Sequence, residues 1–190
     1  MERQIGTRVR IAGFGGQGVI LSGMILGRAV SIFENKHATL MQSFGPEARG
    51  GACSAQVILS DEQILYPYVK TPDVLVAMSQ QALRLYLPTL RPGGKLVYEK
   101  DLVSLDDGDE IPEGVSTYGV PATKIAEKLR RRIVLNIVMV GFFSAVAPVV
   151  SMESARKAVL HSVPRGTEAL NGRAFDMGYQ YGDATYGGGS

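Results

Sequence analysis

The feature that most constrains this chain is a glycine-rich segment, GFGGQG, that spans Gly13 to Gly18. Before it, residues 8–14 alternate polar and apolar side chains, which predicts a short strand. After it, apolar residues recur at helical spacing over residues 17–33, which predicts a largely buried helix. A glycine-rich turn between a strand and a helix is typical of α/β proteins that bind the phosphates of a nucleotide cofactor.

The physical chemistry of this loop favours an anionic ligand. Gly13, Gly15 and Gly18 allow positive φ angles and a close approach of the backbone, and the first amides of the following helix would point at a phosphate. A simple turn between a strand and a helix would not need the additional Gly16 and Gln17. We expect Gln17 either to cap the helix or to contact the ligand. A tight turn without a ligand stays open as the simpler alternative.

A second loop, FGPEARGG at residues 44–51, follows a strand predicted over residues 38–43. Because both loops leave the carboxyl ends of strands, we expect them to meet at the edge of the sheet where α/β proteins bind ligands. An arginine there offers a planar phosphate donor, and a surface ion pair with Glu47 or Glu62 is the alternative use for it. The contacts predicted from this loop and the strand before it are Ser43, Glu47, Arg49, Gly50 and Gly51.

An ordinary NAD site is disfavoured, because such folds place an acidic residue at the end of the second strand to bind the ribose hydroxyls. Here that strand ends in Gln42 and Ser43, and Glu34 comes before the strand begins. A methyltransferase-like domain, suggested by RPGGKLV at residues 91–97, meets the same objection. A free-standing dinucleotide-binding module of the NAD or FAD type and a non-catalytic scaffold subunit remain as alternatives.

The rest of the chain continues the alternation of strands and helices. The acidic stretch 99–113 lacks periodicity and reads as a surface loop. The pattern predicts an α/β fold, a doubly wound Rossmann-like sheet with helices on both faces and a β-hairpin insertion made by residues 52–59 and 64–68. We expect one domain over residues 1–181 and a flexible tail over 182–190. Further strands are predicted at residues 73–78 and 96–98, and further helices at 80–90, 122–132, 136–147, 152–162 and 167–179.

Composition excludes several classes of function. A single cysteine, Cys53, with two histidines gives no zinc or iron–sulfur motif, so any redox centre is expected on another chain. The net charge is +2 with dispersed basic residues, so no nucleic-acid partner is expected. The chain has no apolar run long enough to span a bilayer and no evident secretion signal, so no membrane association and a cytoplasmic location are predicted.

Four segments carry a family resemblance: GFGGQGVILSG, MQSFGPEARGGACSAQVI, NIVMVGFF and VPRGTEALNGRAFDMGY. Together they resemble the gamma subunit of 2-oxoacid:ferredoxin oxidoreductases, most nearly the 2-oxoglutarate members, over residues 8–181. The resemblance implies an enzyme that decarboxylates a 2-oxoacid, passes two electrons through iron–sulfur clusters to ferredoxin, and transfers the acyl group to coenzyme A. Pyruvate enzymes contain a related domain, so the family is better defined than the substrate.

The resemblance also implies how the work is divided among subunits. Thiamine diphosphate with Mg and the iron–sulfur clusters would bind to partner subunits, namely alpha, beta and a ferredoxin-like delta subunit. This chain would not be active alone, and a homodimer is one possible form of the isolated chain.

Coenzyme A is the cofactor that the resemblance assigns to this chain, and no catalytic residue is assigned. Its implied contacts are the glycine loop, the second loop and Asn136. The residues alone also explain Asn136 as a helix cap, because it heads an apolar helix. From the glycine loop the implied contacts are Gly13, Gly15, Gly16, Gln17 and Gly18.

Overall fold

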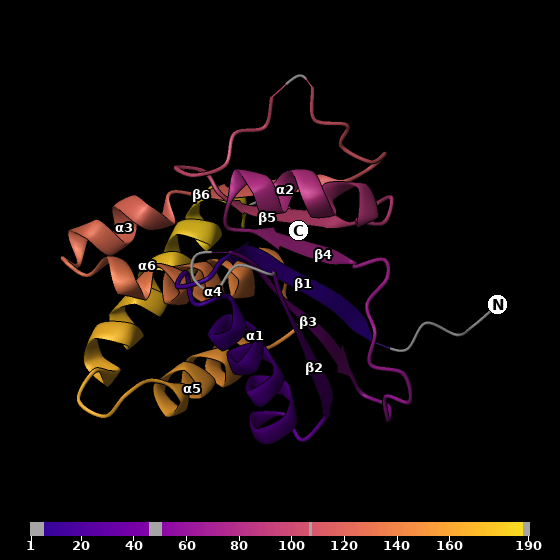
Figure 1. Ribbon diagram of the computed structural model, residues 1–190. Helices are drawn as coiled ribbons and strands as arrows, with labels where there is room; N and C mark the ends of the chain where they lie inside the picture. The colour runs from indigo at the N-terminus through magenta and orange to yellow at the C-terminus, as the bar shows by residue number, and fades with distance from the viewer. Residues whose placement is uncertain (1–5, 46–50, 107, 188–190) are drawn as a thin grey trace.

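The structure, a computed structural model, describes residues 6–45, 51–106 and 108–187. It contains one six-stranded mixed sheet in the order β2-β3-β1-β4-β5-β6, packed between helices (Figure 1). The strands are β1 (Thr7–Phe14), β2 (His37–Phe44), β3 (Ala52–Ser60), β4 (Val74–Ala77), β5 (Lys95–Glu99) and β6 (Ser116–Val120). The helices are α1 (Val19–Arg28), α2 (Gln80–Tyr86), α3 (Ala122–Lys128), α4 (Leu135–Val146), α5 (Met152–Ser162) and α6 (Glu168–Tyr186).

The pairing of the strands decides where the two predicted loops lie. β1, β4, β5 and β6 are parallel to one another, whereas β3 lies antiparallel between β1 and β2. Phe14 at the end of β1 is opposite Ala52, and Phe44 at the end of β2 is opposite Cys53. The carboxyl ends of β1 and β2 therefore flank the start of β3 at one edge of the sheet.

Two hydrophobic cores hold helices on both faces of this sheet. The larger core joins Val9 and Ile11 of β1 to apolar side chains of α1, α4, α5 and α6. The smaller core packs Leu75 of β4 and Leu96 of β5 against Leu83 of α2. The fully buried VLVA sequence of β4 is typical of a central parallel strand. The predicted α/β class is confirmed.

The predicted return strand at residues 64–68 is wrong, and no strand forms there. The period-two pattern of Ile64, Tyr66 and Tyr68 indicated a strand, but both edges of β3 are already occupied by β1 and β2. A third partner has no backbone edge to pair with, so residues 61–73 cross to β4 without regular structure. The antiparallel hairpin of this fold is instead formed by β2 and β3.

The C-terminal helix is longer than predicted and closes one edge of the sheet. α6 continues to Tyr186, so residues 182–186 are helical rather than a flexible tail, and residues 188–190 lie outside the described part of the chain. The Tyr186 hydroxyl accepts a hydrogen bond from Gly119 N (3.1 Å) and donates one to Gly119 O (3.3 Å). Gly119 belongs to β6, an edge strand that the sequence did not predict.

Glu99 also departs from the predicted surface loop, because it ends β5 and is fully buried. Its Oε1 accepts a hydrogen bond from Thr123 N at 3.1 Å, and Oε2 has no hydrogen-bond partner among the described residues. Loss of hydration on burial raises the pKa of Glu99, since the charged form is the one that water stabilises. The folded protein therefore binds this proton more tightly than the unfolded chain does.

This burial predicts a pH-dependent effect of Glu99→Gln. Stability contributed by the bound proton is present below the unfolded pKa of glutamate and is lost as pH rises through the folded pKa. The glutamine cannot ionise, so the variant should gain thermal stability over the native chain by a few degrees at about pH 7.5 and by nothing at about pH 3.5. Calorimetric scans across pH measure this difference. A difference that does not change with pH would contradict the burial of a titrating carboxyl.

Candidate functional site

The glycine loop joins β1 to α1, as the sequence predicted, and adopts a backbone that needs glycine. Gly16 and Gly18 have φ angles of +94° and +74°, in the left-handed region. Gly18 is the N-cap of α1, and among the described residues no side chain caps the helix there. The amides of the first turn have no partner within the helix, so they are available to an anion. Gly15 and Gly16 are exposed.

The second loop meets the glycine loop directly. Gly15 N donates a hydrogen bond to Gly51 O at 2.9 Å, at the point where β3 begins beside the end of β1. Ser43 is exposed near the end of β2, one position from the loop. The structure thus brings Gly51 and Ser43 to the edge that holds the glycine loop. The other predicted contacts of this loop, Glu47, Arg49 and Gly50, lie outside the described residues.

Gln17 does not cap α1, and its amide is engaged within the protein. Its Oε1 accepts a hydrogen bond from Phe14 N at 2.7 Å, and its Nε2 donates one to Met78 O at 2.9 Å. Met78 follows β4, so this side chain ties together the ends of two neighbouring strands. A Cβ at Gly13 would overlap Gln17 Oε1, which explains the glycine at that position. Gln17 therefore shapes the loop from inside.

Asn136 lies against the glycine loop, although 118 residues separate it from Gly18. It is a buried residue of the first turn of α4, and its Nδ2 is 3.5 Å from Gly18 O. The N-cap of α4 is Val134, so the predicted capping role is wrong. A Cβ at Gly18 would come within 2.5 Å of the Asn136 amide. Glycine at 18 therefore makes room for Asn136 as well as for the turn.

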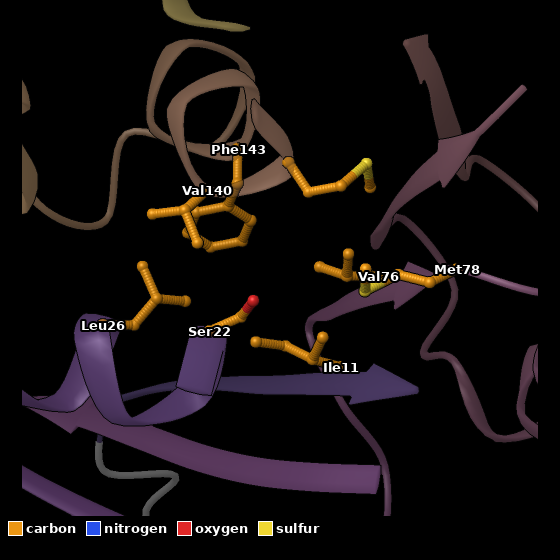
Figure 2. Close-up of a pocket in the computed structure, with 8 residues that line it drawn as sticks. Ile11, Ser22, Leu26, Val76, Met78, Val140 and Phe143 are labelled. Atoms are coloured by element: carbon orange, nitrogen blue, oxygen red, sulfur yellow. The ribbon is translucent and has the colours of Figure 1, made fainter. Parts of the chain in front are cut away.

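A small cavity beneath the loop is too small and too apolar to hold a cofactor. It lies between α1, α4 and the sheet and encloses about 10 Å³, about the room of one water molecule. Figure 2 shows the side chains that surround it, including Ile11, Val76 and Phe143. The lone hydroxyl among them, that of Ser22, donates a hydrogen bond to Gly18 O. This cavity therefore does not hold the ligand that the glycine loop is predicted to bind.

A family model described as pyruvate ferredoxin/flavodoxin oxidoreductase matches residues 8–181. The chain belongs to this family. It is a subunit of a 2-oxoacid:ferredoxin oxidoreductase, an oxidoreductase complex, which confirms the resemblance found in the sequence.

Known members of the family match closely. The 2-oxoglutarate synthase subunit KorC of Methanocaldococcus jannaschii is 49% identical over 173 residues, covering 90% of this chain and 91% of that protein. The gamma subunit of a keto/oxoacid ferredoxin oxidoreductase from Geobacter sulfurreducens is 40% identical with a TM-score of 0.81, covering 94% of this chain and 99% of that one.

A 2-oxoglutarate:ferredoxin oxidoreductase from Magnetococcus marinus, with 2-oxoglutarate, coenzyme A and succinyl-CoA bound, gives a TM-score of 0.83 at 26% identity. The match covers 96% of this chain but only 32% of the Magnetococcus chain. In that relative, the domain is therefore part of a much longer polypeptide.

The lone cysteine of this oxidoreductase-family chain lies next to the two loops but is not activated. Cys53 is buried at the start of β3, and burial raises the pKa of its thiol. A raised pKa disfavours the thiolate, which is the reactive form. Cys53 thus behaves as a small core residue.

Within residues 6–45, 51–106 and 108–187, no group of three or more His, Cys, Asp or Glu side chains could hold a metal ion. The helices described there include none with the length and apolar character needed to cross a bilayer.

Proposed function

We propose that this chain is the gamma subunit of a 2-oxoglutarate:ferredoxin oxidoreductase and that its glycine loop binds a phosphate of coenzyme A. The complex would decarboxylate the 2-oxoacid oxidatively to the acyl-CoA and pass electrons to ferredoxin. The observation that carries the role of this chain is the contact of two glycine-containing loops, Gly15 N to Gly51 O, at the carboxyl edge of the sheet.

The choice of 2-oxoglutarate rests on relatives. The KorC protein is 49% identical and is named a 2-oxoglutarate synthase subunit, and the Magnetococcus enzyme holds 2-oxoglutarate with coenzyme A. Thiamine diphosphate with Mg and the iron–sulfur clusters belong, in this proposal, to alpha, beta and ferredoxin-like delta partners. A cytoplasmic location stays a prediction from the sequence.

The residues of the loop fit a phosphate. A Cβ added at Gly16 would meet no atom within 4 Å, so the space beside that backbone is open. Next to it are the uncapped first-turn amides of α1, which favour a negative charge. Coenzyme A would supply the thiol that takes up the acyl group.

In this chain, loop amides would hold a phosphate while two side chains keep the loop in shape. Gln17 fixes the ends of β1 and β4, and Asn136 supports Gly18 from below. In this proposal Ser43 near the end of β2 and Gly51 would contact the same ligand, and we retain Glu47, Arg49 and Gly50 as proposed contacts. The alternative of an NAD-type module is weaker, because β2 ends without a carboxylate for the ribose.

The proposal predicts that Gly16→Ala weakens coenzyme A binding at least tenfold, which is about 1.4 kcal/mol. The methyl group would enter the space assigned to the phosphate. Calorimetric titration of coenzyme A into the complex reconstituted from this chain and its partner subunits measures the dissociation constant.

Gly166→Ala provides a matched control for backbone strain. Gly166 has a φ of +86°, and a Cβ there would also meet no atom within 4 Å, but it lies in the turn between α5 and α6. This control should lose similar thermal stability and bind coenzyme A like the native chain. Equal coenzyme A affinities for both variants would show that the glycine loop is not part of the binding site.

A further inference from the structure

A second cavity lies at the amino ends of three parallel strands. It encloses about 390 Å³, which falls within the range of roughly 300–1,000 Å³ that is usual for small-molecule sites. The first residues of β1, β4 and β5 (Thr7, Val74 and Lys95) line it, and residues 147–149 after α4 close another side. We call this cavity the amino-edge pocket.

The amino-edge pocket and the glycine loop are at opposite ends of the sheet. β1 begins at the pocket with Thr7 and ends at the glycine loop with Phe14. Because a strand rises about 3.3 Å per residue, these two ends are about 23 Å apart. A ligand of the pocket would therefore use residues that the proposed coenzyme A phosphate site does not.

The RPGG turn before β5 places two cationic side chains on this pocket, those of Arg91 and Lys95. The turn is fixed against the start of β4, because Arg91 N donates to Pro72 O (3.1 Å) and Lys95 N donates to Asp73 O (2.9 Å). A Cβ at Gly94 would come within 2.8 Å of Arg91 O and 2.9 Å of Asp73 O, which explains the glycine there. The proposed function gives this sequence motif no role.

The charge of Arg91 exceeds what its neighbour Asp73 needs. Arg8 already satisfies Asp73 with its backbone amide at 2.7 Å and with its Nε and Nη2, each at 3.1 Å. Arg91 Nε lies 2.8 Å from Asp73 Oδ1, and its side chain is 48% exposed. Among the described residues, the two Nη groups of Arg91 have no hydrogen-bond or ion-pair partner. They are therefore available to a ligand.

Lys95 also keeps free hydrogen-bond donors. Its Nζ donates to Val146 O at 2.8 Å, at the carboxyl end of α4, and lies 5.4 Å from the centroid of the Tyr118 ring. A lysine ammonium has three N–H groups, and this carbonyl takes one of them. In the part of the chain that the structure describes, Lys95 forms no ion pair. The bond to α4 thus holds an uncompensated positive charge at the wall of the pocket.

We infer that the amino-edge pocket binds a small organic anion through a carboxylate or phosphate group. Arg8, Arg91 and Lys95 outnumber the carboxylate of Asp73, so the pocket has an excess of positive charge that favours an anion. The planar Nη groups of Arg91 and the ammonium of Lys95 would both donate to the anionic group. The apolar side formed by Val74 and residues 147–149 would contact the carbon atoms of the ligand.

Calorimetric titration of the full chain with inorganic phosphate and, separately, with succinate tests this inference at constant ionic strength. Saturable binding of at least one probe is expected, and the tighter probe identifies the anionic group. Arg91→Gln and Lys95→Gln should each weaken that binding about tenfold or more, because a hydrogen bond to a charged group contributes about 1.5–3 kcal/mol.

Arg156→Gln is the matched control for charge. Arg156 Nε lies 2.8 Å from Asp176 Oδ1 and its side chain is 39% exposed, much as in Arg91, but it joins α5 to α6. This variant loses the same charge, so it should bind the probe within about twofold of the native chain. Circular dichroism checks that all three variants fold.

A chemical measurement on the native chain needs no variant. A bound anion should slow the acetylation of Lys95 by acetic anhydride, because its ammonium is engaged and covered. Lys157, which pairs with Glu153 on α5, should react at the same rate with and without the probe. Mass spectrometry of the peptides measures both rates.

Four outcomes would overturn the inference. The first is no saturable binding of either probe, and the second is equal weakening by Arg91→Gln and Arg156→Gln, which would indicate general attraction to a basic protein. The third is equal slowing of acetylation at Lys95 and Lys157. The fourth is binding that Gly16→Ala abolishes and Arg91→Gln leaves intact, which would place the anion at the glycine loop.

Discussion

Gly178→Ala is expected to lower the midpoint of thermal unfolding by about 6–12 °C, from a loss of about 3 kcal/mol. The reason is the close contact of α4 and α6, whose backbones touch through two glycines. A Cβ at Gly178 would overlap the carbonyl oxygen of Val138, and one at Gly141 would overlap that of Phe175. Backbone atoms on both sides leave no flexible group that could move aside.

Gly27→Ala is the matched control for this substitution. Gly27 is also helical, but its Cβ would meet only Ala38 Cβ at 3.8 Å, an ordinary contact. Alanine in a helix interior is about 0.5–1 kcal/mol more favourable than glycine, so this variant should unfold at the same or a higher temperature. Scanning calorimetry compares the two. Similar midpoints for both variants would show that α4 and α6 do not pack as closely as described.

Gly18→Ala is expected to cost about 3 kcal/mol of folding free energy, since it combines two penalties. The left-handed backbone at +74° costs an L-residue about 1–2 kcal/mol, and the new methyl group would overlap Asn136. Urea unfolding measures the loss. Coenzyme A affinity should fall as well, because the turn that aims the first amides of α1 is distorted.

A double-mutant cycle with Asn136→Ala separates the two penalties. Removal of the Asn136 amide relieves the two shortest contacts, of 2.5 Å each, and leaves the one to the Cβ at 2.8 Å, so Gly18→Ala should cost at least about 1 kcal/mol less in that background. The backbone strain would remain in both. Strictly additive costs would mean that the loop and the start of α4 are not in contact, and would remove Asn136 from the site.

Local pattern was sufficient to predict most of the sheet and the position of the glycine loop. Turn chemistry and side-chain period are local properties, and they placed GFGGQG between β1 and α1. The strand predicted at 64–68 failed for a non-local reason, because the neighbours of β3 are set by tertiary pairing. Glu99 was assigned to a solvated loop because its acidic neighbours dominate the composition, and nothing adjacent to it in sequence reports its burial.

Local sequence pattern also could not predict which contacts the polar side chains of the site make. Both groups of the Gln17 amide are engaged by the backbone of Phe14 and Met78, and Met78 is 61 residues away. Asn136 reaches the loop from a helix that begins more than a hundred residues later. The sequence indicated that these residues belong near the loop, while only the packing distinguishes supports from ligand contacts.

The hydroxyl of Tyr186 has a consequence for where this domain can be shortened. The family model matches residues 8–181, so a truncated variant of the domain would naturally be ended at residue 181. A truncation there would strip the last turn of α6 from β6 and leave the amide and carbonyl of Gly119 open to solvent. An uncovered edge strand can pair with a strand of another molecule. The final helical turn thus covers part of the outer edge of β6 at Gly119, although it lies beyond the residues that the family model matches.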